Sequence, residues 1–325
     1  MKNVEELFIL FQKELDKREL LQQPVELYAP INYIMQLGGK RLRPILLLMT
    51  YELFRDDVEY ALPAAYAIEM FHNFSLVHDD IMDEAELRRG KPTVHHKYNV
   101  NTGILSGDVM LIYTYKCLME LSGNPNLDKI LRIFNQVAID VCEGQQMDMN
   151  FEERLDVRLS EYLQMIEMKT AALLAGALQI GALAAGASQQ DAQHAYEFGR
   201  NIGIAFQLQD DLLDSFGDPE KFGKKVGGDI VQNKKTFLVL KSLELGNEDE
   251  KEQLLTLLAQ KEIDETSKIE AVKAIFESLK IPEQTSALKN MYQQKALSHL
   301  KGINVSDWKK NKLQDLTNKM LGREV

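Results

Sequence analysis

Two aspartate clusters with the same D-D-x-x-D spacing are the residues of this chain best suited to chemistry. The first comprises Asp79, Asp80 and Asp83, and the second comprises Asp210, Asp211 and Asp214. Residues four apart on a helix share a face, so the first and last aspartate of each cluster would stack and repel each other. Hard divalent cations, Mg²⁺ above all, relieve this repulsion, because they prefer carboxylate oxygens and complete their shell with water and phosphates. The spacing therefore predicts carboxylates that bind divalent metal ions.

The surrounding sequence decides between a metal site and an ordinary acidic surface. A single D-D-x-x-D motif is more often a solvated helix face. Here apolar residues flank both motifs: Phe71, Phe74, Leu76, Val77, Ile81 and Met82 around the first, and Phe206, Leu208, Leu212 and Leu213 around the second. Acidic side chains within apolar helices are costly to bury unless they are paired or bind metal. Two such clusters favour a shared metal site.

Basic residues accompany the aspartates at four places in the chain. They are Lys40, Arg41 and Arg43 after two glycines, then Arg88, Arg89 and Lys91, then Lys169 before Thr170, and finally Lys224, Lys225, Lys234 and Lys235. Each group alone is compatible with a solvated charged surface, although glycines before a basic helix start are typical of an anion site. Together with the aspartates, they indicate a site for two polyanions, and diphosphates fit best.

The chemistry of such a site is expected to be electrophilic. The chain has no Walker-type phosphate loop, no G-x-G-x-x-G motif and no serine, cysteine or histidine nucleophile in a motif context. Metal ions would draw a diphosphate leaving group away, and the organic remainder would become a carbocation.

Helices must position these residues, since helical periodicity fills nearly every long segment and no convincing strand alternation occurs. The predicted helices span residues 3–22, 26–37, 41–54, 59–83, 102–121, 126–149, 159–186, 189–216, 233–245, 249–261, 264–279, 282–301 and 306–321. No long low-complexity linker interrupts them, so we predict an all-α fold with one domain over residues 1–325. The small-residue run 171–187 falls short of about 20 strongly apolar residues, and we expect a core helix and no membrane span.

Composition narrows the function further. The 325 residues include 38 Lys and Arg against 49 Asp and Glu, and the net charge of −11 disfavours general nucleic-acid binding. Two cysteines, Cys117 and Cys142, suit a reducing compartment, and the acidic N-terminus does not resemble a signal peptide. We therefore expect a cytoplasmic protein that binds no nucleic acid.

The motif G-G-K-R-L-R-P at residues 38–44, followed by the two D-D-x-x-D motifs, resembles the trans-isoprenyl diphosphate synthases of the polyprenyl synthetase family, which include farnesyl and geranylgeranyl diphosphate synthases. The resemblance extends from Gly38 to Lys234. It implies an all-α helical bundle around a deep apolar cavity, usually a homodimer. It also implies a Mg²⁺-dependent prenyltransferase that condenses isopentenyl diphosphate with an allylic diphosphate and releases diphosphate.

The resemblance implies roles for residues at matching positions. Two Mg²⁺ would be ligated by Asp79 and Asp83 and a third by Asp210, with support from Asp80, Asp211 and Asp214. The allylic diphosphate would be held by Arg88, Lys169, Gln207 and Lys224, with Lys234 within reach. Isopentenyl diphosphate would be held by Lys40, Arg43, His72 and Arg89, with Arg41 nearby. The developing cation would be stabilised by Lys169, the Thr170 carbonyl and Gln207. We expect loss of either outer aspartate of the first cluster to cost more activity than loss of Asp214.

Product length is expected to depend on the helix that carries Asp79. Ser75, Phe74 and Phe71 precede it and would lie about 6, 7.5 and 12 Å below it along the helix. Members of the family that stop at C15 often carry aromatic residues at both nearer positions, or an insertion in the first motif. One aromatic, a small Ser75 and no insertion resemble the geranylgeranyl diphosphate synthases. We predict mainly a C20 product, with C15 as the alternative.

Two less favoured interpretations share parts of this pattern. A class I terpene cyclase has the same fold and one such motif, but its second metal motif differs and it needs no isopentenyl site. A non-catalytic subunit of a heteromeric synthase tends to lose aspartates, whereas both motifs are complete in this chain.

Overall fold

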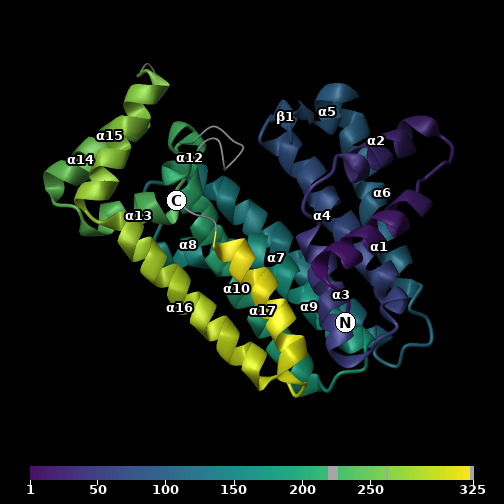
Figure 1. Cartoon of the computed structure of the whole chain (residues 1–325). Coiled ribbons are helices and arrows are strands. Elements are labelled where there is room, and N and C mark those ends of the chain that lie inside the picture. Colours follow the sequence, from purple (N-terminus) through teal and green to yellow (C-terminus); the bar gives the residue numbers. More distant parts are fainter. Residues whose placement is uncertain (219–225, 261–262, 323–325) are drawn as a thin grey trace. The chain divides into compact units, whose positions relative to one another are not determined.

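Helices form almost all of the computed structural model (Figure 1). It describes residues 1–218, 226–260 and 263–322. The predicted all-α fold class is confirmed. The chain divides into two compact units: the first comprises Met1–Ala138, Leu173–Tyr196 and Leu300–Leu313, and the second comprises Ile139–Ala172, Glu197–His299 and Gln314–Val325. The boundaries fall inside long helices, and a single domain stays a prediction.

The elements follow the predicted order. The first half of the chain contains α1 (Val4–Lys17), α2 (Val25–Gln36), α3 (Leu42–Phe54), the 3₁₀ helix η1 (Val58–Ala61), α4 (Leu62–Met82), the strands β1 (Leu87–Arg88) and β2 (Lys91–Pro92), α5 (Val94–Lys97), α6 (Val100–Met119) and α7 (Leu127–Glu153). The second half contains α8 (Leu159–Ile166), the π-helical turn η2 (Glu167–Ala171), α9 (Ala172–Ala184), α10 (Gln189–Phe216), α12 (Gly228–Val231), α13 (Phe237–Leu245), α14 (Glu248–Ala259), α15 (Glu265–Ser278), α16 (Ile281–Gly302) and α17 (Asp307–Leu321).

Helix α4 is the centre of the first unit, where it packs against α3 and α6 and also touches α1 and α2 (Figure 1). Nearly every side chain from Leu62 to Phe74 is buried. A helix that is apolar all round is stable only inside a core. Burial is less complete from Ser75 onward, so the last two turns of α4 carry the first aspartate cluster out of the core.

The chain after α4 forms a hairpin that sequence periodicity did not reveal. Strands β1 and β2 pair antiparallel, with Arg88 opposite Lys91. The two turn residues, Arg89 and Gly90, have φ angles of 54° and 72°. Positive φ at both central positions suits a two-residue hairpin turn, and glycine at the second position favours it. Strands of two residues are too short to show alternation in the sequence.

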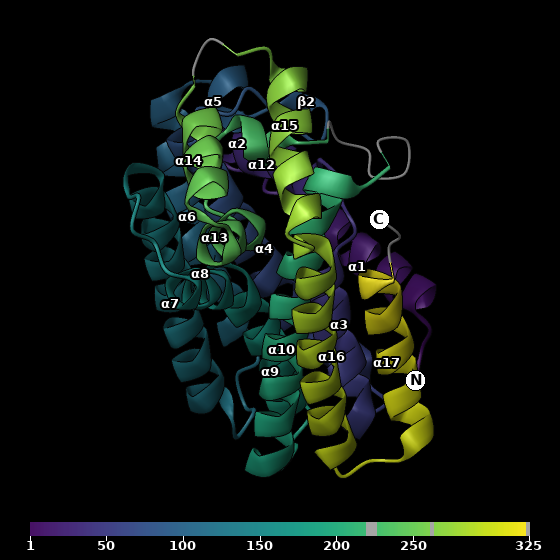
Figure 2. The same cartoon turned by 90° about the vertical axis from the view of Figure 1, so that its left-hand side faces the viewer.

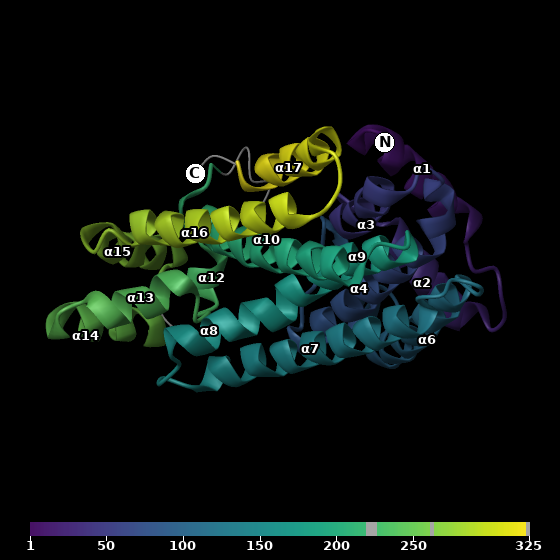
Figure 3. The ribbon, with the colours of Figure 1, turned by 90° about the horizontal axis from the view of Figure 1, so that it is seen from below.

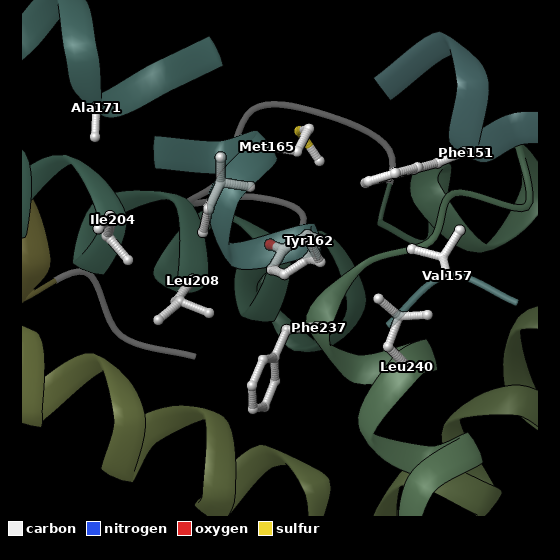
Figure 4. Close-up of a cluster of buried hydrophobic side chains, with 10 residues drawn as sticks. Phe151, Val157, Tyr162, Met165, Ala171, Ile204, Leu208, Phe237 and Leu240 are labelled. Atoms are coloured by element: carbon white, nitrogen blue, oxygen red, sulfur yellow. The ribbon is translucent and has the colours of Figure 1, made fainter. Parts of the chain in front are cut away.

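The second unit has a hydrophobic core of its own (Figure 4). Its buried members are Phe151, Val157, Tyr162, Met165, Ile166, Ala171, Ile204, Leu208, Phe237 and Leu240. Helices α13, α14 and α15 pack together (Figure 3). Helix α16 runs beside α10 (Figures 2 and 3), where Lys289 Nζ donates a hydrogen bond to Gln209 Oε1 at 2.7 Å. The second aspartate cluster lies on α10 and is therefore among the packed helices of this unit.

For two of the predicted helices, long-range side-chain contacts explain why the observed bounds differ. Helix α1 is shorter than predicted, since Asn32 hydrogen bonds both the N–H and the C=O of Leu20, at 2.9 and 3.1 Å, and holds the following segment outside the helix. Helix α13 begins later than predicted. Asn233 has a φ of 58°, and its side chain accepts a hydrogen bond from Lys268 Nζ at 2.6 Å. Local sequence patterns do not encode contacts of this kind.

Among the described residues, one helical segment, Leu159–Ala184, is long and apolar enough to cross a membrane by length and composition alone. In the structure, 72% of its most apolar window is buried. Close packing explains why its residues are small: a Cβ on Gly181 would lie 2.4 Å from the carbonyl oxygen of Leu47. The predicted core helix over residues 171–187 is therefore confirmed.

Candidate active site

The first aspartate cluster lies at the C-terminal end of α4. Asp79 is half-buried in the last turn, and Asp83 is the exposed residue that caps the helix. The backbone N–H of Asp83 donates to the carbonyl of Asp79 at 2.9 Å, so the two residues are one helical turn apart, as their spacing predicted. Asp80 differs from both, because it is only 1% exposed. The cluster therefore presents two accessible carboxylates and one buried carboxylate.

Asp80 is the counterion of Arg88. The guanidinium of Arg88 donates three hydrogen bonds to the two carboxylate oxygens of Asp80, at 2.7 to 2.9 Å. Paired contacts of this kind fix the orientation of an arginine side chain as well as its position. The structure thus places Arg88 beside the first cluster, with the buried carboxylate of Asp80 as its partner.

The hairpin turn sends the neighbouring Arg89 in another direction. Its guanidinium donates to the carbonyl oxygen of Gly38. Gly39 has a φ of 118°, and a Cβ there would lie 2.8 Å from the Arg89 guanidinium. The positive φ favours glycine at this position, and the Arg89 guanidinium lies close against it. The φ angles of Gly38 and Gly39, 80° and 118°, explain why the basic motif begins with two glycines.

His72 and Arg43 form the centre of the predicted isopentenyl diphosphate site. Arg43 Nη1 donates to Nε2 of His72 at 3.3 Å, which requires an unprotonated Nε2. Burial, and then the positive charge of Arg43 and Arg89, lower the pKa of His72 well below its ordinary value. Burial also lowers the pKa of Arg43, the charge of Glu69 raises it and that of Arg89 lowers it. A neutral imidazole among guanidinium groups leaves their charge available to an anion.

Arg41, which is expected near the isopentenyl diphosphate site, has a buried side chain. It is 4% exposed and forms an ion pair with Glu69, at 2.5 Å between Nη1 and Oε1. Asn73 also donates to this carboxylate oxygen, at 3.2 Å. Arg41 is therefore committed to the interior, whereas Lys40 is exposed. The sequence analysis did not single out Glu69 or Asn73. Glu69 lies in the apolar run before Asp79, and this was the available signal of a buried ion pair, because a buried charge needs a partner.

The second aspartate cluster, on α10, has one buried member as well. Asp211 is 3% exposed and accepts hydrogen bonds from the hydroxyl of Tyr162, from Gln207 Nε2 at 3.1 Å and from the N–H of Phe237 at 3.4 Å. Burial, and then the charge of Asp229, raise the pKa of Asp211 to about 7, and the hydrogen bonds oppose this shift. Asp211 therefore ties α10 to α8 and α13.

The other two aspartates of this cluster are less buried. Asp210 is half-buried, and Asp214 accepts a hydrogen bond from the backbone N–H of Asp229 at 3.0 Å. The N–H of Lys234 donates to the carbonyl of Asp229 at 2.9 Å, which places the predicted Lys234 in the loop after α12. Lys224 lies outside the described residues.

Lys169 and Thr170 lie in the π-helical turn η2. Such turns are rare and occur often at functional sites, where they displace side chains and carbonyls from the regular helix. Lys169 Nζ pairs with Asp148 of α7 at 2.5 Å, and the Thr170 hydroxyl donates to Gln207 Oε1 at 3.2 Å. A Cβ on Gly144 would lie 2.3 Å from the backbone nitrogen of Lys169. The structure thus pairs Thr170 with Gln207 and the neighbouring Lys169 with Asp148, and the roles of these residues stay predictions.

An aromatic cluster surrounds the predicted chain-length residues. The rings of Phe71 and Phe74 are 5.4 Å apart, and Phe134 of α7 lies edge-on to Phe71 at 5.2 Å. Tyr115 of α6 lies edge-on to Phe134 at 5.1 Å. The hydroxyl of Ser75 donates to the carbonyl of His72 at 2.9 Å. The side chain at this position is small. Phe134 and Tyr115 come from other helices, so a sequence pattern on one helix could not reveal them.

The carboxylates suit a magnesium ion that shares its ligands with a substrate. Among residues 1–218, 226–260 and 263–322, no three His, Cys, Asp or Glu side chains are grouped so that they could hold a metal ion by themselves. Mg²⁺ is commonly bound by one or two carboxylates, with water and substrate phosphates in the remaining positions. The accessible pair Asp79 and Asp83 fits that donor set.

The fold and this site define an all-helical protein whose accessible carboxylates and clustered guanidinium groups suit a metal-bound diphosphate. Residues 24–277 match the model of the polyprenyl synthetase family, and the chain belongs to that family. It is a trans-isoprenyl diphosphate synthase, a prenyltransferase of isoprenoid biosynthesis. The family uses divalent metal ions and acts on isopentenyl and allylic diphosphates.

Known relatives support this assignment over most of the chain. The geranylgeranyl diphosphate synthase of Sulfolobus acidocaldarius is 46% identical over 239 residues, which are 73% of this chain and 72% of that protein. The short chain isoprenyl diphosphate synthase of Methanocaldococcus jannaschii is 41% identical over 254 residues, 78% of this chain and 77% of that protein. The crystal structure of a geranylgeranyl pyrophosphate synthase, 44% identical, superimposes with a TM-score of 0.95 over 100% of both chains.

Proposed function

We propose that the protein elongates allylic diphosphates with isopentenyl diphosphate to a main product of C20, geranylgeranyl diphosphate. The observation that most supports the use of isopentenyl diphosphate is the group of guanidiniums around neutral His72, on the helix that carries the carboxylates of Asp79 and Asp83. A terpene cyclase would need the carboxylates but not Arg43, Arg89 and His72, since it uses no isopentenyl diphosphate. A C15 product is the alternative.

We propose that three Mg²⁺ bind per active site, two at Asp79 and Asp83 and a third at Asp210. Bound Mg²⁺ would supply Lewis-acid stabilisation of the charge that develops on the leaving diphosphate. Arg88, held by Asp80, would add a fixed positive charge for the same group. A preoriented guanidinium stabilises developing charge without reorganising at the moment of reaction.

The second unit is proposed to stabilise the allylic cation. The Thr170 carbonyl and Gln207 present partial negative charge from the π turn and α10, and Lys169 would contact the diphosphate. The allylic C–O bond breaks, and the double bond of isopentenyl diphosphate forms the new C–C bond. A proton then passes to the released diphosphate, so the reaction needs no side-chain base.

The product length is proposed to be set by the aromatic cluster below Asp79. Phe74 is 8% exposed and Phe71 is fully buried, and Phe134 supports them from α7. A growing chain that passes the small Ser75 would meet Phe74 next. Farnesyl diphosphate would therefore still accept one more unit, and longer chains would be blocked.

The test is the product distribution from labelled isopentenyl diphosphate with dimethylallyl or farnesyl diphosphate in Mg²⁺ buffer. We expect C20 to dominate with either starter. A dominant C15 product from dimethylallyl diphosphate would select the alternative, and a dominant product beyond C25 would refute the aromatic floor.

We also propose that the protein is a homodimer. Helix α6 exposes a row of large apolar side chains: Ile104, Leu105, Ile112 and Met119, at 43 to 65% exposure. Large exposed apolar side chains repeated along one helix favour an interaction site. Light scattering should give twice the chain mass of 37.1 kDa, and a monomer at micromolar concentration would contradict the proposal. Cytoplasmic location stays a prediction.

A further inference from the structure

We propose that Glu69 is a positioning residue for the glycine loop, residues 37–41 between α2 and α3, which helps to bind isopentenyl diphosphate, and that Glu69 acts through Arg41. The inference rests on the proposed function, because it assigns that substrate to Arg43, His72 and Arg89. Glu69 is 2% exposed on α4 and does not itself contact substrate. Its effect would be on where Lys40 and Arg43, the cations on either side of Arg41, lie.

The contacts of Arg41 show how one side chain can hold the loop. Nη1 of Arg41 donates to Glu69 at 2.5 Å, and Nη2 donates to the carbonyl of Met35, at the end of α2, also at 2.5 Å. One guanidinium therefore connects α2, the glycine loop and α4. Asn73 donates to the same carboxylate oxygen at 3.2 Å and keeps Glu69 in place.

The backbone of the loop needs such a support. Arg41 has a φ of 48° and is the residue before α3, in the left-handed region that costs energy for side chains with a Cβ. Gly38 and Gly39, which precede it, have φ angles of 80° and 118°. Because they lack a Cβ, their own side chains do not restrict the backbone of the loop. The buried ion pair is thus the contact that keeps Arg41 in its strained conformation. Arg43, two residues later, takes its direction from this anchor.

Glu69 also offsets repulsion among the guanidinium groups. Its negative charge favours the protonated forms of both Arg43 and Arg89, against burial and against repulsion by neighbouring guanidinium groups. Without that charge, Arg41 would lack a buried counterion and would leave its position or draw in water. The cations that face the diphosphate would then move with the loop.

The test is Glu69→Gln, which keeps the shape of the side chain and removes its charge. We expect the KM for isopentenyl diphosphate to rise about tenfold or more, while the KM for the allylic diphosphate changes less than about threefold. Glu69→Asp retains the charge on a shorter side chain and should restore part of the affinity. Calorimetric titration with isopentenyl diphosphate should give the tightest binding for the wild type, weaker binding for Glu69→Asp and the weakest for Glu69→Gln.

The matched control is Glu52→Gln. Glu52 is also 2% exposed and lies on α3, but it accepts a hydrogen bond from the N–H of Lys2 at 2.8 Å and contacts none of the loop. We expect Glu52→Gln to lose thermal stability, as we expect of Glu69→Gln, and its two KM values to stay at the wild-type level. A purely structural role for Glu69 would make the two variants alike.

Folded Glu69→Gln protein with a wild-type KM for isopentenyl diphosphate would overturn the inference. If that variant does not fold, Glu69→Asp and Arg41→Lys are measured instead, and wild-type KM values in both would overturn it equally. Failure of the wild-type protein to bind isopentenyl diphosphate would refute the proposed function, and is recognised because it appears without any substitution.

Discussion

Phe74 should determine where the product chain stops, and its removal tests the aromatic floor. The ring of Phe74 lies 5.4 Å from the ring of Phe71, measured between centroids. One isoprene unit contributes four main-chain carbons, an extended length of about 5 Å. Phe74→Ala should therefore open room for about one further unit and shift the main product from C20 to C25.

The next barrier is expected to hold in that variant. Phe71 is fully buried and is supported edge-on by Phe134 at 5.2 Å. Elongation should stop there, and only the double variant with Phe71→Ala should yield C30 or longer. Replacing a fully buried Phe by Ala costs about 3–5 kcal/mol.

The assay uses labelled isopentenyl diphosphate with farnesyl diphosphate, followed by dephosphorylation and reversed-phase separation of the alcohols. The control is Phe276→Ala, which removes a fully buried ring from a separate core cluster and should leave the product length unchanged. An unchanged distribution in Phe74→Ala, or an equal shift in the Phe276 variant, would refute the assignment of Phe74 to the floor.

Three further predictions concern other parts of the site. Ser75→Phe should shift the main product from C20 to C15 in the same assay, because a second aromatic side chain would lie one residue closer to the carboxylates. Asp79→Asn should raise the Mg²⁺ concentration needed for half-maximal activity at least about tenfold, whereas Asp80→Asn should lower the maximal rate with little change in that concentration, because Asp80 holds Arg88. His72 is kept neutral by its lowered pKa, so its contribution to stability is complete above pH about 6.5 and falls as the pH drops below that value.

Each of these has a contradicting result. A C20 product from Ser75→Phe would remove the explanation of product length by that position. Equal Mg²⁺ requirements in the two aspartate variants would show that the buried and accessible carboxylates have the same role. For His72, thermal unfolding is followed between pH 5 and 8, and a His72→Gln variant with the same acid-side loss as wild type would contradict the assignment.

The motifs allowed much of the fold and the site to be predicted from the sequence. Helix α10 spans Gln189–Phe216, the range that periodicity indicated, because a long amphipathic pattern is a strong local signal. The two D-D-x-x-D motifs and the G-G-K-R-L-R-P motif could be found because the residues of each lie close together in the sequence. Their roles as metal and diphosphate ligands stay predictions that the geometry supports.

The remaining features depend on contacts between distant residues. Asp80 and Asp211 are buried, whereas their neighbours Asp79 and Asp210 are not. The D-D-x-x-D pattern alone does not show which of its aspartates is buried. The ion pair between Arg41 and Glu69 joins residues 28 positions apart. Spacing along one helix could not show which charges are paired inside and which face a ligand.

The central claim is tested most directly by measuring diphosphate release from isopentenyl diphosphate and dimethylallyl diphosphate, with and without Mg²⁺. The account predicts release that requires both substrates and Mg²⁺, with one diphosphate freed for each isopentenyl unit incorporated. Release without isopentenyl diphosphate would indicate a cyclase or a phosphatase. No Mg²⁺-dependent release from the purified wild-type protein would contradict the account.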